Sequence, residues 1–388
     1  MRPPTRRSLL PLALALAGGW LLAPAAPAAA EGPSQVTFEG HGYGHGIGMS
    51  QYGAYGAARE GRTQRQITAF YYPGTEVGRA SGKVRVRLSG DADGDVVVEA
   101  RPRLRVRDLG RSGAAALTRL PDNGARQWRL RPGAGSGGAV VSFRDDRQWR
   151  FWRRLSGGGE LDAQGAAVTL VTAAGPRRYR GALRLAVGET VNVLGLDNYL
   201  KGVVPLEMPA AWAPAAVQAQ AVAARSYAAW ERQHPRGDHF DVHDTVTSQV
   251  YGGFGAEHPD SNRAVERTAG EVRTSGGRPA FTQFSSSNGG HTAPGSQPYL
   301  RARPDPYDGW SGNPNHDWRT SVPASAFESR WPGIGDLTGV RVVRRDGHGE
   351  WNGRALQVRI TGSRGSTTVS GPDLRFALGL RSHWFRVV

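Results

Sequence analysis

Alternation of apolar and polar residues is the clearest pattern in the middle of the chain. The runs Lys83–Leu88, Asp95–Glu99 and Ala167–Val171 alternate or are continuously apolar, and Gly- and Asp-rich turns separate them. A period of two directs successive side chains to opposite faces of a strand, so the pattern predicts short β-strands from residue 83 to about 190. No set of residues there suggests catalysis, and we interpret residues 83–188 as a β-rich accessory region.

A helical pattern appears in the Ala-rich segment from Pro214 to about Arg232. Proline suits the first turn of a helix, where its missing N–H costs nothing. One stripe has the spacing of a buried helix face and consists of Val217, Ala221, Ala224 and Ala228. Gln218 and Arg225 lie seven residues apart and share another face.

The two ends of the chain mix short elements with glycine-rich loops. His41–Gln51 is too rich in glycine for a helix, whereas Gln51 to about Phe70 predicts one or two short helices. Near the other end we expect a strand over Ala280–Phe284, strands at 356–360 and 378–385, and a short helix near Leu374. The fold class is therefore α+β, with residues 31–80 as a motif segment and 189–388 as the core.

The first 30 residues are typical of a secretion signal. Arg2, Arg6 and Arg7 precede an apolar run from Leu9 to Leu22, and small residues at 28–30 offer a cleavage site. We expect a mature chain that begins near Glu31 in the extracytoplasmic envelope. A twin-arginine export route is one reading of the adjacent arginines, and a single anchor helix is an alternative to cleavage.

Charge and cysteine content narrow the chemistry. The chain has no Cys, which excludes a thiolate nucleophile, disulfides and a Cys-ligated metal. The formal charge of +16 falls to about +13 without the three signal arginines, so a polyanion is the expected kind of partner. Nucleic acid and the anionic polymers of the envelope both qualify, and the export signal favours the envelope polymers over nucleic acid.

Glu207 is the strongest candidate for catalysis. It lies between Pro205 and Pro209 among apolar residues, and desolvation there should raise its pKa, as a general acid for a glycosidic oxygen requires. The alternative is a structural carboxylate at a helix start or in an ion pair. A second carboxylate, which hydrolysis would need, has its nearest candidates in Asp197 and Asp244.

Two glycine-rich loops carry other chemistry-bearing residues. His41 and His45 with Met49 suggest a metal site, and Ser287 with His291 suggests a nucleophile and its base. Zinc would need a ligand that the sequence does not identify. We therefore interpret both loops as lining a sugar-binding groove, and expect no metal and no cofactor.

Four segments resemble the SpoIID/LytB family of stage II sporulation protein D-like proteins. They are Tyr199–Ala229, Asp244–Gly253, Phe284–His291 and Gly44–Ala54, the last continuing to Tyr71–Thr75. The resemblance implies a SpoIID-like core with mixed strands and an Ala-rich helix after the catalytic Glu. It also implies a lytic transglycosylase that cleaves MurNAc–GlcNAc bonds of denuded peptidoglycan strands.

By the same resemblance, Glu207 corresponds to the catalytic acid and Arg225 to a required basic residue. His45, Gln51, Tyr227, Ser287 and His291 are then expected to bind the sugar. The rival hypothesis is a non-catalytic wall-binding module that enhances a cell-wall amidase.

The chain departs from the family pattern in three ways. The Gly-His motif precedes the core here, whereas the family usually carries it after the C-terminal Leu-Gly-Leu-Arg-Ser segment, as if by circular permutation. The mature termini should then lie close together. Gln218 stands where the family often has Lys, and the lack of Cys excludes the Cys-containing zinc site of some relatives.

Overall fold

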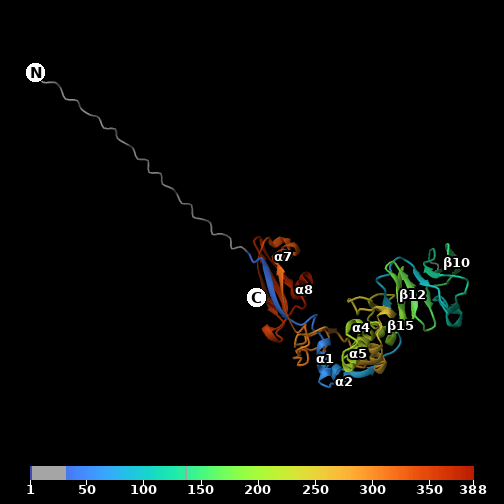
Figure 1. Ribbon diagram of the computed structural model, residues 1–388, viewed down its shortest axis with the longest axis horizontal. Helices are drawn as coiled ribbons and strands as arrows, with labels where there is room; N and C mark the ends of the chain where they lie inside the picture. Colours follow the sequence, from blue (N-terminus) through green and yellow to red (C-terminus); the bar gives the residue numbers. More distant parts are fainter. Residues whose placement is uncertain (2–31, 136–137) are drawn as a thin grey trace.

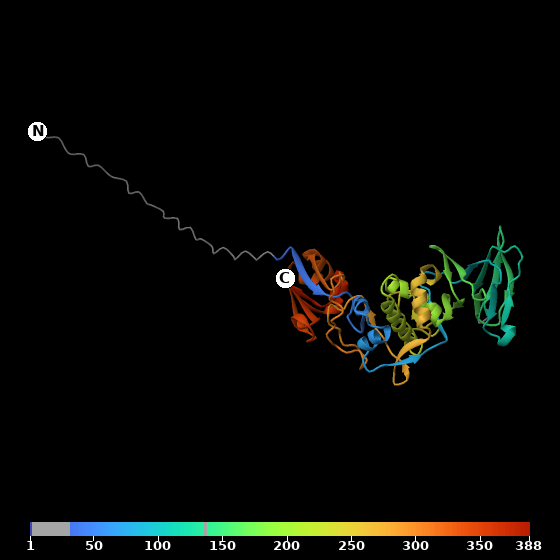
Figure 2. The ribbon, with the colours of Figure 1, turned by 60° about the horizontal axis from the view of Figure 1, so that its bottom comes forward.

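The computed structural model describes Met1, residues 32–135 and residues 138–388, and the expected signal segment lies outside them. Figures 1 and 2 show three parts in a row: a unit built from both ends of the chain, a central part around α5, and a β-rich part that carries β10 and β12. The α+β class is confirmed. None of the described helices is both long and apolar enough to cross a membrane.

The helices are short apart from one. Their bounds are α1 Gln51–Arg59, α2 Gln64–Tyr71, α3 Leu196–Lys201, α4 Val204–Glu207, α5 Pro214–Glu231, α6 Pro259–Arg267, α7 Ala324–Arg330 and α8 Gly371–Leu378. The two helices expected before residue 73 and the one near Leu374 are confirmed. Local sequence determines where the first two of these helices begin, because Ser50 caps α1 and Thr63 forms a capping box with Gln66 at α2.

Helix α5 is the centre of the molecule. Its predicted stripe is buried, but most of its other positions are buried too. Such a helix must be enclosed on all sides, and α1, α2, α3, α6 and strand β17 (Glu271–Ser275) pack around it. It therefore fixes the positions of the loops that precede and follow it.

The accessory region consists of short strands, as the alternation predicted. Two sheets share one core, which includes Trp128, Leu130 and Leu161. One sheet has the order β10-β9-β8-β5-β12-β13 and the other β16-β4-β15-β14-β11-β6-β7. The bounds are β4 Lys83–Arg87, β5 Val96–Glu99, β6 Arg105–Asp108, β7 Leu117–Arg119, β8 Gln127–Arg131, β9 Val140–Arg144, β10 Trp149–Arg154, β11 Gly159–Asp162, β12 Val168–Thr172, β13 Gly175–Tyr179, β14 Ala182–Ala186, β15 Glu189–Gly195 and β16 Val242–His243.

The ends of the described chain meet in a separate unit with its own core around Phe38, Phe327 and Phe385. Strand β1 (Gln35–His41) lies between β20 (Asp317–Pro323) and β24 (Phe385–Val387). A second sheet joins β21 (Leu337–Arg345), β22 (Ala355–Gly362) and β23 (Gly365–Ser370). Because Val388 donates its N–H to Thr37, the prediction that the two ends lie together is confirmed.

Two strand predictions were wrong. Only β18 (Arg278–Pro279) and β19 (Phe284–Ser285) pair as strands near 280–284, because Phe281 and Thr282 bond instead to a tyrosine hydroxyl and to a carbonyl of α5. Residues 378–384 also form no strand: α8 ends at Leu378, and Gly379 caps it in the left-handed conformation that glycine adopts freely. The strand expected at 356–360 lies within β22, and β2 (Met49–Ser50) and β3 (Glu76–Arg79) complete the set.

Candidate active site

Glu207 is the last residue of α4, a single turn held between two prolines. Its backbone N–H donates to Val203, and its Oε1 accepts a hydrogen bond of 3.0 Å from the backbone N–H of Val250. The other oxygen, Oε2, has no hydrogen-bond partner among the described residues and is not fully enclosed. The carboxyl group is therefore fixed at one oxygen and open at the other.

Burial raises the pKa of Glu207 above its ordinary value, and the Val250 N–H partly offsets that rise. No charged side chain contributes to the shift. Desolvation is thus the dominant cause, as its apolar sequence neighbours predicted. A carboxyl group of this kind holds its proton at higher pH than a solvated glutamate does.

Two buried polar pairs involve the neighbours of Val250, whose N–H holds this carboxyl group. The hydroxyl of Tyr199 donates to Gln249 at 3.3 Å, and that of Tyr251 donates to Asn192 at 2.6 Å. Burial, and then the nearby Glu207 carboxylate, raise the pKa of Tyr199. The Nε2 group of Gln249 is buried without a partner. Residues 249–251 thus form one wall of the site, next to the amide that holds Glu207.

Neither of the other candidate carboxylates contacts Glu207. Asp197 is bound to Arg225 at 2.7 Å, and Asp244 accepts from the backbone N–H of Ser89 at 3.1 Å. The other oxygen of Asp244, Oδ1, is buried without a partner, and neither carboxylate forms a pair with Glu207.

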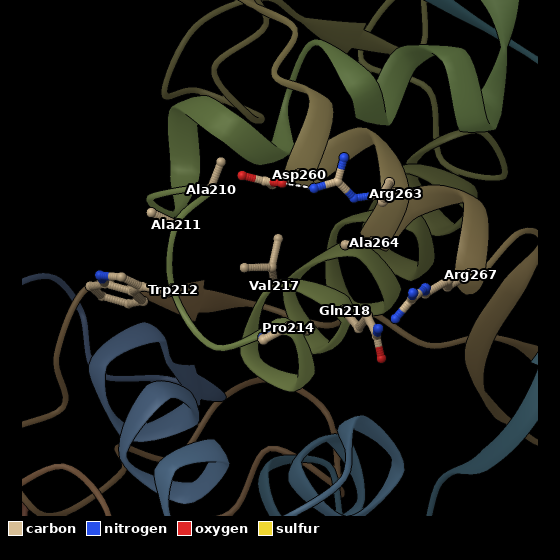
Figure 3. Close-up of a pocket in the computed structure, with 10 residues that line it drawn as sticks. All are labelled: Ala210, Ala211, Trp212, Pro214, Val217, Gln218, Asp260, Arg263, Ala264 and Arg267. Atoms are coloured by element: carbon tan, nitrogen blue, oxygen red, sulfur yellow. Dashed lines mark hydrogen bonds and ion pairs between the residues drawn. The ribbon is translucent and has the colours of Figure 1, made fainter.

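A hollow of about 290 Å³ opens just after Glu207, between the turn at 210–212, the start of α5, and α6. Figure 3 shows Trp212, Gln218 and Arg267 at its rim, with Asp260 and Arg263 paired on α6. Glu207 itself does not line this hollow.

Half-buried aromatic rings continue from the hollow toward α1. Trp212 stacks on Tyr55 with ring centres 4.5 Å apart and meets Tyr52 edge-on at 4.8 Å. Tyr55 in turn meets Trp310 at 5.2 Å. Such rings can pack against the apolar faces of pyranoses as well as against one another.

Arg225 does not lie where a sugar-binding residue would. It is fully buried and donates to Asp197, to the carbonyls of Val265 and Glu271 at 3.1 Å each, and to Thr268. Arg225 therefore joins α5 to α3, α6 and β17, and in this position it cannot reach a ligand. The structure gives Arg225 a role in holding the site together, and the requirement for a basic residue that the resemblance implies stays a prediction.

Tyr227 is also mostly buried. Its ring stacks on Phe281, and its hydroxyl lies 3.5 Å from Arg236, while burial and Glu231 raise its pKa. Gln51 is buried as well and donates to Gln220 of α5 at 3.4 Å. Both residues belong to the packed interior around α5, and neither forms a hydrogen bond with Glu207.

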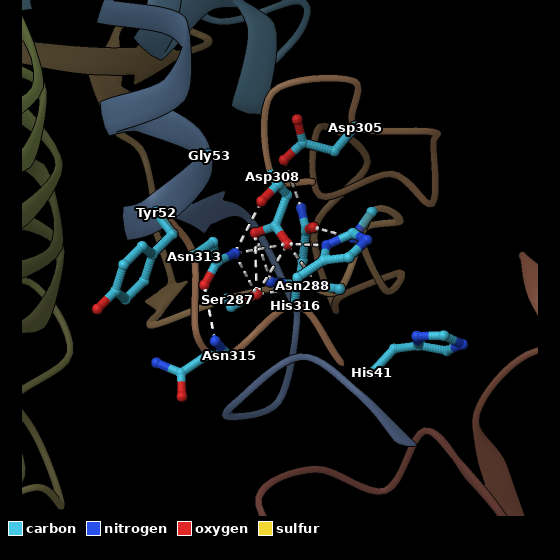
Figure 4. Close-up of polar contacts among 12 residues, drawn as sticks. His41, Tyr52, Gly53, Ser287, Asn288, Asp305, Asp308, Asn313, Asn315 and His316 are labelled. Atoms are coloured by element: carbon cyan, nitrogen blue, oxygen red, sulfur yellow. Dashed lines mark hydrogen bonds and ion pairs between the residues drawn. The ribbon is translucent and has the colours of Figure 1, made fainter. Parts of the chain in front are cut away.

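The two glycine-rich loops come together, as a shared groove would require. Tyr43 bridges to Ser287, Ile47 bridges to Ala293, and β2 pairs with β19. His45 accepts from the Ile47 N–H at 2.9 Å, and burial with nearby Arg375 and Arg354 lowers its pKa to about 4. These loops meet on the side of α1 away from α5 (Figure 4), and no described contact links them to Glu207.

A buried carboxylate, Asp308, ties these loops together. It accepts from Ser50 at 2.5 Å, from Ser287 at 2.8 Å, from Asn313 at 3.1 Å and from the backbone N–H groups of Asn288 and Gly289. His316 approaches it at 2.8 Å, and this bond raises the pKa of His316 (Figure 4). With so many partners, Asp308 is part of the structure of the loops.

The alternative chemistries of these loops are not supported by the geometry. Ser287 donates to Asp308, while His291 bonds to the carbonyl of Thr292 and stacks on His348, so the serine and histidine do not form a pair. His41 bonds to Asp317 at 2.6 Å. Across residues 32–135 and 138–388, no three His, Asp or Glu side chains gather as metal ligands would.

Several residues of the site were not expected from the sequence. Val250 holds Glu207 through its backbone, Tyr199 lies close to the carboxyl group, and Gln249 accepts from the Tyr199 hydroxyl. A signal did exist for Gln249, since it lies in the Asp244–Gly253 segment that resembles the family. Asp308 had no such signal, because a single aspartate in a loop is common.

The fold and the site define an α+β protein with one partly enclosed carboxyl group, a hollow lined by residues that follow it in the chain, and a row of aromatic rings. Residues 187–274 match the family model described as stage II sporulation protein, SpoIID. In this segment, which contains Glu207 and all of α5, the chain is therefore similar to the SpoIID family.

Two relatives have names that agree with this similarity. The chain is 40% identical over 121 residues to the amidase enhancer of Bacillus subtilis, covering 29% of this chain and 16% of that protein. It is 28% identical over 221 residues to stage II sporulation protein D of Bacillus amyloliquefaciens, covering 50% and 60% of the two chains. The chain thus spans less than two thirds of the length of each of these relatives.

Proposed function

We propose that this protein is an exported peptidoglycan lytic transglycosylase with Glu207 as its single general acid. The observation that carries the proposal is the state of Glu207: burial raises its pKa, one oxygen is held by Val250, and no second carboxylate of the described chain contacts it. The similarity to the SpoIID family and the name of the amidase enhancer of Bacillus subtilis support a role at the cell wall.

In the proposed reaction, protonated Glu207 donates its proton to the oxygen of the MurNAc–GlcNAc bond, and the bond from that oxygen to C1 of MurNAc breaks. The C6 hydroxyl of the same MurNAc attacks C1 and returns its proton to the Glu207 carboxylate. The product carries a 1,6-anhydro end, and no water is consumed. The Val250 N–H stabilises the carboxylate that exists between the two proton transfers.

The surroundings of Glu207 suit a glycan strand. The side chain of the adjacent Leu206 is exposed, and the row from Trp212 to Trp310 offers aromatic faces for neighbouring sugars. The glycine-rich loops with His45, Ser287 and His291 contact one another rather than Glu207, and their contribution to sugar binding stays a prediction.

The second candidate function is a wall-binding module that enhances an amidase, and the name of the Bacillus subtilis relative favours it. The two functions differ in what happens after binding. We expect the parent protein to release soluble fragments from denuded glycan strands, and Glu207→Gln to co-sediment with the strands without releasing fragments. Binding by both proteins with no release by either would favour the module.

The raised pKa of Glu207 also predicts a pH-dependent cost in stability. The folded protein favours the protonated form of Glu207. The contribution of this protonated carboxyl group to folding stability is therefore complete below its ordinary pKa of about 4.5, and it is lost as the pH rises through the raised pKa of the folded state. Glu207→Gln keeps the oxygen that accepts from Val250 but never ionises. We expect equal melting temperatures near pH 4 and a higher one for Glu207→Gln at pH 7. If the melting temperatures of the two proteins changed with pH in parallel, the Glu207 carboxyl group would have to be solvated in the folded protein.

A further inference from the structure

Positive charge is concentrated in the accessory region. Residues 83–188 contain 21 Lys and Arg against 10 Asp and Glu, a net charge of +11 out of +16 for the whole chain. A general preference for arginine would spread the charge along the sequence. The region therefore carries a local excess that the candidate active site does not use.

Strand register places part of this excess on one face of the sheet β10-β9-β8-β5-β12-β13. Residues directly opposite each other in antiparallel strands share a face. Arg131 of β8 and Arg154 of β10 both lie opposite Val140, and Arg144 of β9 lies opposite Trp149. The middle row, which runs through Ser142, carries Arg129 and Phe151.

We name this surface the arginine face: Arg129, Arg131, Arg144, Trp149, Phe151 and Arg154. It lies on the side of the sheet away from the core, because the core is built from Trp128, Leu130 and Val141 in the alternate positions. Strand geometry spreads its charges over about 13 Å along the strands and about 10 Å across them.

The charges of the arginine face are largely unneutralised. Arg131, Arg144 and Arg154 are exposed, and among the described residues none of them forms an ion pair or a side-chain hydrogen bond. Arg129 lies over Trp149 at 4.1 Å and approaches Asp95 at 3.8 Å, while its Nε is buried without a partner. Free guanidinium groups at this density favour a ligand with repeated negative charges.

The aromatic residues of the arginine face indicate which polyanion fits. A binder of single-stranded nucleic acid uses successive open rings on which bases stack. Here Arg129 lies over the Trp149 ring, and only Phe151, with 66% of its surface exposed, offers an open ring. The face therefore matches a polymer of charged groups without bases better than it matches nucleic acid.

We propose that the arginine face binds a linear phosphodiester polymer of the cell envelope, and so anchors the chain independently of Glu207. Phosphate is the anion that arginine recognises best, because two N–H groups of one guanidinium can bond to two phosphate oxygens. The polymer would run across β8, β9 and β10, with Arg131, Arg144 and Arg154 at its phosphates.

The test uses a fluorescent glycerol-phosphate dodecamer and the chain from residue 32 onward. The face variant is Arg131→Gln, Arg144→Gln, Arg154→Gln. The control variant, Arg278→Gln, Arg330→Gln, Arg359→Gln, removes the same charge from three exposed arginines on β18, α7 and β22. We expect at least a tenfold weaker Kd for the face variant at low salt, and less than a twofold change for the control.

The dependence of Kd on salt gives a second readout. Each phosphate contact contributes about 0.7 to the slope of log K against log salt for a single strand, so loss of three contacts should lower the slope by about two. Equal losses of affinity in the face variant and the control variant would show that the polymer binds by general charge attraction, and would overturn the proposal. An oligothymidylate with the same number of phosphates that binds tenfold more tightly would assign the face to nucleic acid instead.

Discussion

Glu207→Gln is expected to lower the rate of glycan cleavage by about a thousandfold, while the affinity for the strand changes less than about threefold. General acid catalysis contributes roughly 10²–10⁴ to a rate, and a glutamine cannot donate a proton to the leaving oxygen. Its amide oxygen can still accept from Val250, so the shape of the site is kept. Single-turnover rates and equilibrium binding on the same strands measure the two effects separately.

Asp244→Asn is the matched control for this substitution. Asp244 is a candidate second carboxylate in the matched segment that holds Glu207, yet one of its oxygens bonds to Ser89 and none contacts Glu207. We expect Asp244→Asn to cleave within about threefold of the parent, because a lytic transglycosylase needs one acid only. A loss as large as that of Glu207→Gln would instead indicate a two-carboxylate hydrolase.

Arg225→Ala is expected to destabilise the protein by about 2–4 kcal/mol, because it removes a large buried side chain and its hydrogen bonds, whereas its partner Asp197 is partly exposed and can be hydrated. The substitution leaves the carbonyls of Val265 and Glu271 without their donors and opens a cavity beside α5. Urea unfolding followed by circular dichroism measures the change. The cleavage rate per folded molecule should fall far less than in Glu207→Gln.

Gln218→Ala is the control that separates the loss of stability in Arg225→Ala from the effect of a substitution on the surface of the same helix. Gln218 lies seven residues before Arg225 and lines the rim of the hollow, so we expect a stability change within about 0.5 kcal/mol. If Arg225→Ala unfolded like the parent but bound glycan poorly, Arg225 would have to reach the ligand in a conformation that differs from this one.

The fold was predictable where local pattern decides structure. Period-two runs in 83–188 and the Ala-rich segment after Pro214 gave the correct elements, because burial of one face selects the period. The strand predicted at 280–284 does not form, because polar groups of this segment bond to Tyr299, Tyr72 and α5 rather than to neighbouring strands. Such partners lie far away in the sequence and leave no local signal.

The candidate site was predictable only in part, for the same reason. The raised pKa of Glu207 follows from its immediate neighbours, whereas its bond to Val250 spans 43 residues. The helical spacing placed Arg225 on a face of α5 but could not show that α6 and β17 cover that face. Likewise, the composition of the glycine-rich loops indicated binding chemistry without placing them relative to Glu207.

The most direct test of the central claim is mass spectrometry of denuded glycan strands incubated with the chain from residue 32 onward and, separately, with its Glu207→Gln form. We predict 1,6-anhydroMurNAc ends from the parent protein and intact strands from the variant. Reducing MurNAc ends from the parent, or anhydro ends from both proteins, would contradict a lytic transglycosylase in which Glu207 is the single acid.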